Sequence, residues 1–199
     1  MSLSGMRGHL AGATLLAVAS LQLEAAEQLL KNPAFESTES GIEAWSYSQH
    51  AGDISYEYEG REGVLTIRRT GVEPWGLLAQ KLQAQPLAGQ TLQLTLEVQG
   101  DFVVSGTPVF EPASVNLSVQ GWSENPAMRF MGLQMLGESR YQLPQDLSGG
   151  SWQPVELSLV VPETAVSVEL SLVMGYQGEM RVRNPILRVA AAGTQVGVE

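Results

Sequence analysis

The sequence has no cysteine, few basic residues and only two histidines, and each shortage excludes a class of function. Without cysteine the fold has no disulfides, and no cysteine is available to carry a lipid anchor. The 11 lysines and arginines are outnumbered by 21 acids, so the net charge is -10 and the basic face that nucleic acids require is missing. His9 and His50 cannot supply the usual zinc ligand sets, and no Gly-x-Ser-x-Gly motif accompanies them.

Long hydrophobic runs are also scarce, and the clearest one lies near the start of the chain. Leu10–Ser20 is apolar, follows Arg7 and leads into small residues, which is typical of a bacterial secretory signal peptide. The run is shorter than the roughly 20 apolar residues of a membrane-spanning helix. We therefore predict a signal peptide over 1–26, a periplasmic or extracellular protein and no membrane span. An amphipathic helix that stays on the protein is the alternative.

The rest of the chain alternates apolar and polar residues with a period of two, which predicts strands with one buried face. Glycines separate these segments, as turn residues do. Pro162 and Glu163 predict a turn between two antiparallel strands, and only Ala26–Lys31 has helical character. The expected loops are Val104–Ala113 and Gly137–Gly150. The predicted strands are Ile54–Tyr58, Val64–Arg68, Thr91–Val98, Ser114–Val119, Val155–Val161, Val166–Val173 and Glu179–Val189.

Five segments together resemble the carbohydrate-binding modules of the family 4, 9, 16 and 22 type. They are LLKNPAFESTESGIEAW, GVEPWGLLAQKL, AGQTLQLTLEVQG, SWQPVELSLVVPE and GEMRVRNPILRV, in that order. The resemblance implies an all-β fold, a two-sheet antiparallel β-sandwich (jelly-roll) over residues 27–189, followed by a flexible tail over 190–199. It also implies a concave face or a loop edge that binds glycans.

The same resemblance implies a structural calcium ion in some relatives, held by an early glutamate and by acids of the closing strand. Here Glu36 and Asn184 are the candidate ligands, and Arg183 stands where the relatives often carry an acid. Calcium prefers six to eight oxygen ligands with several carboxylates. We therefore expect no cofactor other than a possible structural calcium, and an ion pair between Arg183 and Glu36 is the alternative.

Two tryptophans beside glycines are candidate sugar platforms at strand ends. Trp75 lies between Pro74 and Gly76, and Trp122 follows a predicted strand into a polar loop. An indole face can stack on the C–H groups of a sugar ring, and nearby amides and carboxylates can bind its hydroxyls. The candidate polar partners are Gln80, Gln120 and Glu73. Packing roles are expected for Trp45, Trp152, Tyr56, Tyr58, Tyr141 and Tyr176.

The leading interpretation is a secreted, noncatalytic domain that binds an oligo- or polysaccharide through edge aromatic residues. The alternative is an interaction or structural domain that binds another envelope or extracellular protein. A small glycosidase ranks third, because Glu57 and Glu59 share one face of a predicted strand but are more simply interpreted as solvated acids.

Overall fold

The computed structural model describes residues 27–103, 110–147 and 150–191, and in these ranges nearly all regular structure is β-strand. The predicted signal peptide (1–26) and most of the tail, from residue 192 on, lie outside the described residues. The helical segments within the described ranges are two short 3-10 turns, η1 (Gln85–Leu87) and η2 (Pro126–Met131). The strands are β1 (Ser37–Thr38), β2 (Gly41–Ile42), β3 (Ser46–Gln49), β4 (Tyr56–Arg61), β5 (Val64–Arg69), β6 (Gly76–Gln83), β7 (Thr91–Val103), β8 (Ser114–Gly121), β9 (Gln134–Gln142), β10 (Gln153–Val160), β11 (Ala165–Met174) and β12 (Gln177–Val189).

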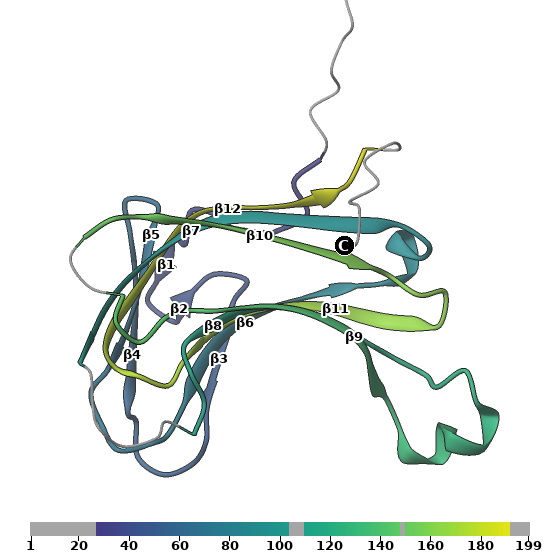
Figure 1. Ribbon diagram of the computed structural model, residues 1–199, viewed down its shortest axis with the longest axis horizontal. Helices are drawn as coiled ribbons and strands as arrows, with labels where there is room; N and C mark the ends of the chain where they lie inside the picture. Colours follow the sequence, from purple (N-terminus) through teal and green to yellow (C-terminus); the bar gives the residue numbers. More distant parts are fainter. Residues whose placement is uncertain (1–26, 104–109, 148–149, 192–199) are drawn as a thin grey trace, which may run out of the picture.

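Two antiparallel five-stranded sheets pack face to face, as Figure 1 shows. The order of one sheet is β10-β7-β12-β5-β4, and the order of the other is β3-β6-β11-β8-β9; β1 and β2 form a separate small ribbon. In the figure the first sheet lies above the second over most of its width. The predicted all-β antiparallel sandwich with jelly-roll architecture is confirmed.

The core forms between the sheets because alternate residues of each long strand point inward. In β7, Leu92, Leu94, Leu96 and Val98 are buried while the residues between them are partly exposed. Strands β8 and β11 supply the opposite wall through a second set of apolar residues. These residues are Val115, Leu117, Val119, Val168, Leu170 and Leu172.

Three local predictions were wrong. The segment around Pro162 does not close a hairpin, because β10 pairs with β7 whereas β11 pairs with β6 and β8. It crosses from one sheet to the other. Residues Gly137–Gln142, expected in a loop, belong to β9, an edge strand with a polar and half-exposed sequence. Glu27–Lys31 form no helix, since Leu29 N–H donates to the Leu187 carbonyl and ties this segment beside β12.

The edge strands β3 and β4 lie on the same side of the sandwich, and aromatic residues fill the space between them. Gly76 at the start of β6 makes this possible. A Cβ atom there would lie 2.5 Å from Cγ of Tyr56 and 2.7 Å from the Tyr58 hydroxyl oxygen. The glycine after Trp75 is therefore required by the packing of two tyrosines that cross beneath it.

No helix in the described ranges is long and apolar enough to cross a membrane.

Candidate functional site

The open edge between the sheets carries a stacked pair of tyrosines. Tyr47 projects from β3 and Tyr58 from β4, with ring centroids 5.6 Å apart and an interplanar angle of 25°. Both side chains occupy inward positions, since Tyr47 pairs with the buried Leu78 and Tyr58 with the buried Ile67. β3 and β4 are the last strands of their sheets, and Gly41 and Ile42 of β2 line the opening beside them. Tyr47 is therefore 62% exposed despite its inward direction.

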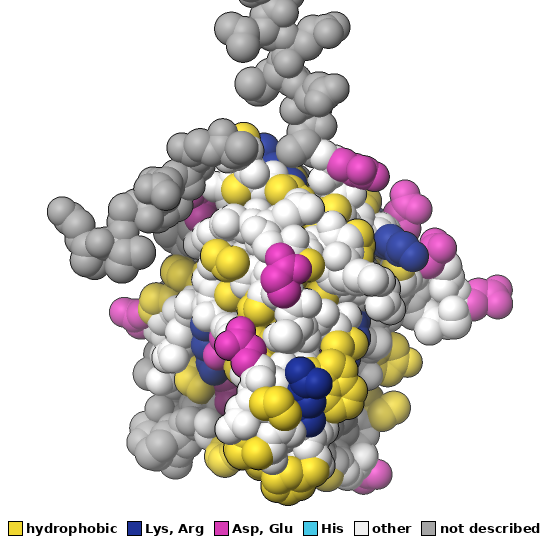
Figure 2. Space-filling model, turned by 90° about the vertical axis from the view of Figure 1, so that its right-hand side faces the viewer, with side chains coloured by type: hydrophobic (Ala, Val, Ile, Leu, Met, Phe, Trp, Pro, Cys, Tyr) yellow, Lys and Arg dark blue, Asp and Glu magenta, His cyan; other side chains and the backbone are white. Residues whose placement is uncertain are grey.

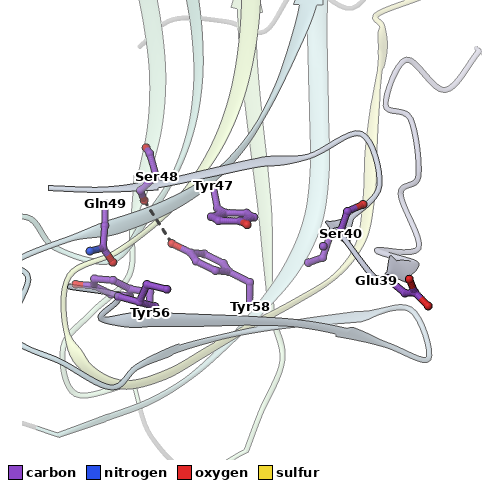
Figure 3. A pocket seen from close by; sticks show the side chains of 10 residues that line it. Glu39, Ser40, Tyr47, Ser48, Gln49, Tyr56 and Tyr58 are labelled. Atoms are coloured by element: carbon purple, nitrogen blue, oxygen red, sulfur yellow. Dashed lines mark hydrogen bonds between the residues drawn. The ribbon is translucent and has the colours of Figure 1, made fainter. Parts of the chain in front are cut away.

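A hollow of about 550 Å³ surrounds this pair. Figure 3 shows Tyr47 and Tyr58 pointing toward one another from the two strands, with Tyr56 deeper and Glu39 and Ser40 at the other end. The Tyr58 hydroxyl donates to the Ser48 carbonyl at 3.5 Å. The other lining residues are Gly41, Ile42, Gln49 and Ile54. An aromatic wall with a carboxylate and a hydroxyl at one end is chemistry suited to a ring that carries both C–H and O–H groups.

The two deeper tyrosines stay neutral across the physiological range. Burial raises the pKa of Tyr56 to about 12, partly opposed by Arg69. The Tyr56 hydroxyl donates to the Glu73 carbonyl at 2.9 Å. Burial and the neighbouring Tyr56 also raise the pKa of Tyr58. Both hydroxyls therefore remain hydrogen-bond donors, and the tyrosines act as fixed walls and not as acids or bases.

Trp75 lies outside this hollow. It is half-buried just before β6, where the His50 ring meets it edge-on with centroids 6.2 Å apart. His50 Nδ1 is 3.0 Å from Oε2 of Glu73, and the same carboxylate oxygen accepts the Ala51 N–H. The carboxylate of Glu73, a predicted ligand contact, is thus engaged in holding the loop that supports Trp75.

Trp122 follows the end of β8 and is 45% exposed. It borders a second hollow of about 370 Å³, where Gln83, Gln85 and Glu163 supply polar groups. The side-chain oxygen of Thr164 in the same wall is buried and has no hydrogen-bond partner. The polar groups beside Trp122 thus come from residues other than the predicted partners Gln80, Gln120 and Glu73.

The two candidate tryptophans lie near opposite ends of one strand, β11. Trp75 precedes Gly76, which pairs with Met174, whereas Trp122 follows Gly121, which pairs with Ala165. Met174 and Ala165 are the two ends of β11. At about 3.3 Å per residue, the tryptophans are separated by roughly 30 Å along that strand.

The two predicted glutamines have different surroundings. Gln80 is 4% exposed, and its side chain both accepts from the Lys31 N–H at 2.7 Å and donates to the Lys31 carbonyl at 2.8 Å. Its amide is therefore occupied within the fold. Gln120 is half-exposed on β8, paired with Ser167 and Met135.

That outer face of the second sheet is unusually rich in small polar residues that are nevertheless buried. The buried residues are Ser114, Asn116, Ser118, Ser167 and Ser171. Ser114 Oγ and Asn116 Oδ1 have no hydrogen-bond partner. Their position on a sheet face, opposite the core side of β8 and β11, was not anticipated because serine in a strand carries no signal of burial.

The residues predicted to hold calcium have separate partners. Asn184 donates to Glu97 at 2.8 Å, and Arg183 forms a two-pronged ion pair with the same carboxylate at 2.9 and 3.0 Å. Arg183 pairs with Glu97 and not with Glu36, the partner considered as the alternative to calcium. Glu36 instead borders a different hollow, which it shares with Lys31 and Glu43. No cluster of three or more potential metal ligands exists among the described residues, and this donor set does not fit calcium.

Solved structures share this fold, although no protein-family model and no curated sequence matches the chain. The enzymatically active domain of bacteriophage CBA120 tailspike protein 4 aligns with a TM-score of 0.56 and 13% identity. The alignment covers 82% of this chain and 21% of the tailspike chain, so the chain spans about a fifth of that protein's length.

Two carbohydrate-binding modules match over their whole length. A family 4 module aligns with a TM-score of 0.51 and 15% identity over 80% of this chain and 99% of the module. The module TmCBM61, in complex with β-1,4-galactotriose, aligns with a TM-score of 0.50 and 15% identity over 83% and 100%. The chain has the galactose-binding-like β-jelly-roll fold of these modules, which confirms the resemblance at the level of fold.

Proposed function

We propose that the protein is a noncatalytic carbohydrate-binding domain that binds an oligo- or polysaccharide at the β3/β4 edge. The observation that carries the proposal is the Tyr47–Tyr58 stack above the hollow of about 550 Å³. One face of Tyr47 is supported by Tyr58, and its side chain is 62% exposed. A sugar ring can therefore stack on a platform whose orientation is already fixed, which reduces the entropy lost on binding.

The hollow is better suited to binding than to hydrolysis. Among the described residues Glu39 is its one lining carboxylate, whereas the common glycosidase mechanisms need two acids across the scissile bond. Glu57, one of the two acids considered from the sequence, lies exposed on β4 and pairs with Arg68 at 3.3 Å. Support for sugar as the ligand also comes from the fold, because the modules that share it include one in complex with β-1,4-galactotriose.

Binding isotherms test this proposal with β-1,4-galactotriose as the first probe, followed by a panel of soluble β-linked glucans, xylans and galactans. Tyr47→Ala should weaken binding by about 1–3 kcal/mol, the cost of one lost aromatic contact. Tyr47→Phe should bind nearly as well as the wild type, because the ring is kept. Neither change should alter stability much at so exposed a position.

Trp122→Ala is the matched control, because it removes another exposed aromatic side chain. Trp122 follows Gly121, which pairs with Ala165, whereas Tyr47 lies beside Leu78, which pairs with Leu172 toward the other end of β11. Equal loss of binding in Tyr47→Ala and Trp122→Ala would contradict a site confined to the β3/β4 edge. Loss in Trp122→Ala alone would move the site to the hollow beside it. Unchanged binding in Tyr47→Ala would contradict the proposed site.

We also propose that the domain acts outside the cytoplasm, on the support of the Leu10–Ser20 run and of the extracellular glycans that such a domain would meet. The exported protein should then begin between Ser20 and Glu27. Its intact mass measures this directly, and recovery of the full-length chain from the periplasm or medium would contradict the cleavage.

A further inference from the structure

A protruding segment between β8 and β9 carries an apolar surface that the fold does not use. This segment, residues 123–133, contains η2 and is called the η2 lobe; it hangs below the right-hand end of the sandwich in Figure 1. No residue of η2 is buried. The exposed fractions are 85% for Phe130, 58% for Met131, 45% for Leu133 and 38% for Met128, and Met135 at the start of β9 adds 58%.

Figure 2 shows hydrophobic side chains gathered at the lower end of the molecule, the end from which η2 projects in Figure 1. Scattered exposed apolar residues are normal on soluble proteins, but a contiguous group on one projection marks an interaction surface. Within the described residues this is the densest run of exposed large apolar side chains.

The backbone of the lobe is ordered by its own hydrogen bonds. Asn125 Oδ1 accepts the Ala127 N–H, Met128 N–H donates to the Asn125 carbonyl, and Gly132 N–H donates to the Arg129 carbonyl. Arg129 Nε donates to the Ser123 carbonyl. Peptide groups that already have hydrogen-bond partners enter an apolar medium at a lower free-energy cost than peptide groups without partners.

The charge of the lobe differs from that of the whole protein. The chain has a net charge of -10, whereas the lobe carries one acid, Glu124, and one base, Arg129, and so has no net charge. Arg129 is exposed beside Phe130 and Met131. An arginine next to apolar side chains can lay its stem along an apolar surface while its guanidinium meets phosphate groups.

The shape and size of the η2 lobe favour a lipid surface over a protein as its partner. The lobe is a projection and not a groove, and its apolar set comprises five side chains. A stable protein interface uses roughly 20–30 residues on each side. A lipid surface needs no preformed complementary hollow and accepts a small apolar projection within its headgroup layer.

We propose that the η2 lobe docks the protein onto a lipid membrane surface, with Phe130 and Met131 entering the acyl boundary and Arg129 at the level of the phosphates. The docking is peripheral and reversible. It is independent of sugar binding, because the lobe lies beyond β8 while the tyrosine pair lies between β3 and β4.

Sedimentation with phosphatidylcholine vesicles tests the proposal. The wild-type chain should partition onto the vesicles, and the double variant Phe130→Ser, Met131→Ser should bind about tenfold or more weakly, because two large apolar contacts are lost. Val72→Ser is the matched control, since Val72 is 87% exposed in a turn far from the lobe. It should bind vesicles like the wild type.

A single-cysteine label locates the contact, because the natural chain has no cysteine. An environment-sensitive dye at Met131→Cys should shift to the blue on addition of vesicles, and the same dye at Val72→Cys should not. Failure of the wild type to bind vesicles would overturn the proposal. A monomer–dimer equilibrium abolished by the double serine variant, without vesicle binding, would overturn it in favour of a second copy of the chain.

Discussion

The buried amide of Gln80 fastens the N-terminal segment to the second sheet, and its replacement by leucine tests that role. Gln80 Oε1 accepts the Lys31 N–H at 2.7 Å and its Nε2 donates to the Lys31 carbonyl at 2.8 Å. Leucine has a similar volume but can make neither hydrogen bond. Two hydrogen bonds at about 1 kcal/mol each set the expected loss of unfolding free energy at about 2 kcal/mol.

The loss stays near that value because Lys31 lies at the surface, where its freed peptide groups can turn toward water. For a domain of this size the melting temperature should fall by about 4–8 °C. Equilibrium unfolding in urea measures the free energy, and circular dichroism on heating measures the melting temperature. Binding of a sugar probe should be unchanged, since the amide is enclosed within the fold.

Gln120→Leu is the natural control for this experiment. Both glutamines were candidate sugar contacts in the sequence, but Gln120 is half-exposed on the outer face of β8. Its replacement should change stability by no more than about 0.5 kcal/mol, as surface changes usually do. If Gln80→Leu were equally neutral, or abolished sugar binding at full stability, the assignment of Gln80 to a structural role would be refuted.

Two further predictions concern the charged cluster at β12. Hydrogen bonds from Arg183, then from Asn184, lower the pKa of Glu97 in the folded protein. The ionised carboxylate therefore contributes fully to the stability of the fold above the unfolded pKa near 4.5, and this contribution is lost as the pH falls through the lower folded pKa. Urea unfolding between about pH 5 and pH 3 should show a steeper loss of stability for the wild type than for Glu97→Gln; equal slopes would contradict the linkage. Chelator treatment should leave the melting temperature unchanged, because Glu36 and Asn184 have different partners, and a fall reversed by calcium would show a metal site there.

Strands with regular alternation were the predictable part of the fold. Thr91–Val98 was recognised within β7, and Val166–Val173 within β11, because each places successive apolar residues on one side. β9 was missed because, as an exposed edge strand, it buries little and its sequence carries weak alternation. The crossing at Pro162 was mistaken for a hairpin, since a turn in the sequence does not say which sheet the next strand joins.

The candidate site was less predictable from the sequence because it depends on a contact between strands of two different sheets. Tyr47 belongs to a four-residue strand, SYSQ, with no apolar pattern, and its platform depends on Tyr58 of another sheet. Only the packing of β3 over β4 creates the pair. The signal available in the sequence was the close spacing of three tyrosines with Gly76, whose missing side chain leaves room for two of them.

The place of β12 in its sheet has a consequence for the order in which the sheet can form during synthesis. β12 lies between β7 and β5, so Gln177–Val189 join the pair β10-β7 to the pair β5-β4. Until β12 has left the ribosome, the pairs β10-β7 and β5-β4 lack the strand that joins them. Pairing of strands that are far apart in the sequence is also slow. The first sheet should therefore be completed only after β12 has left the ribosome.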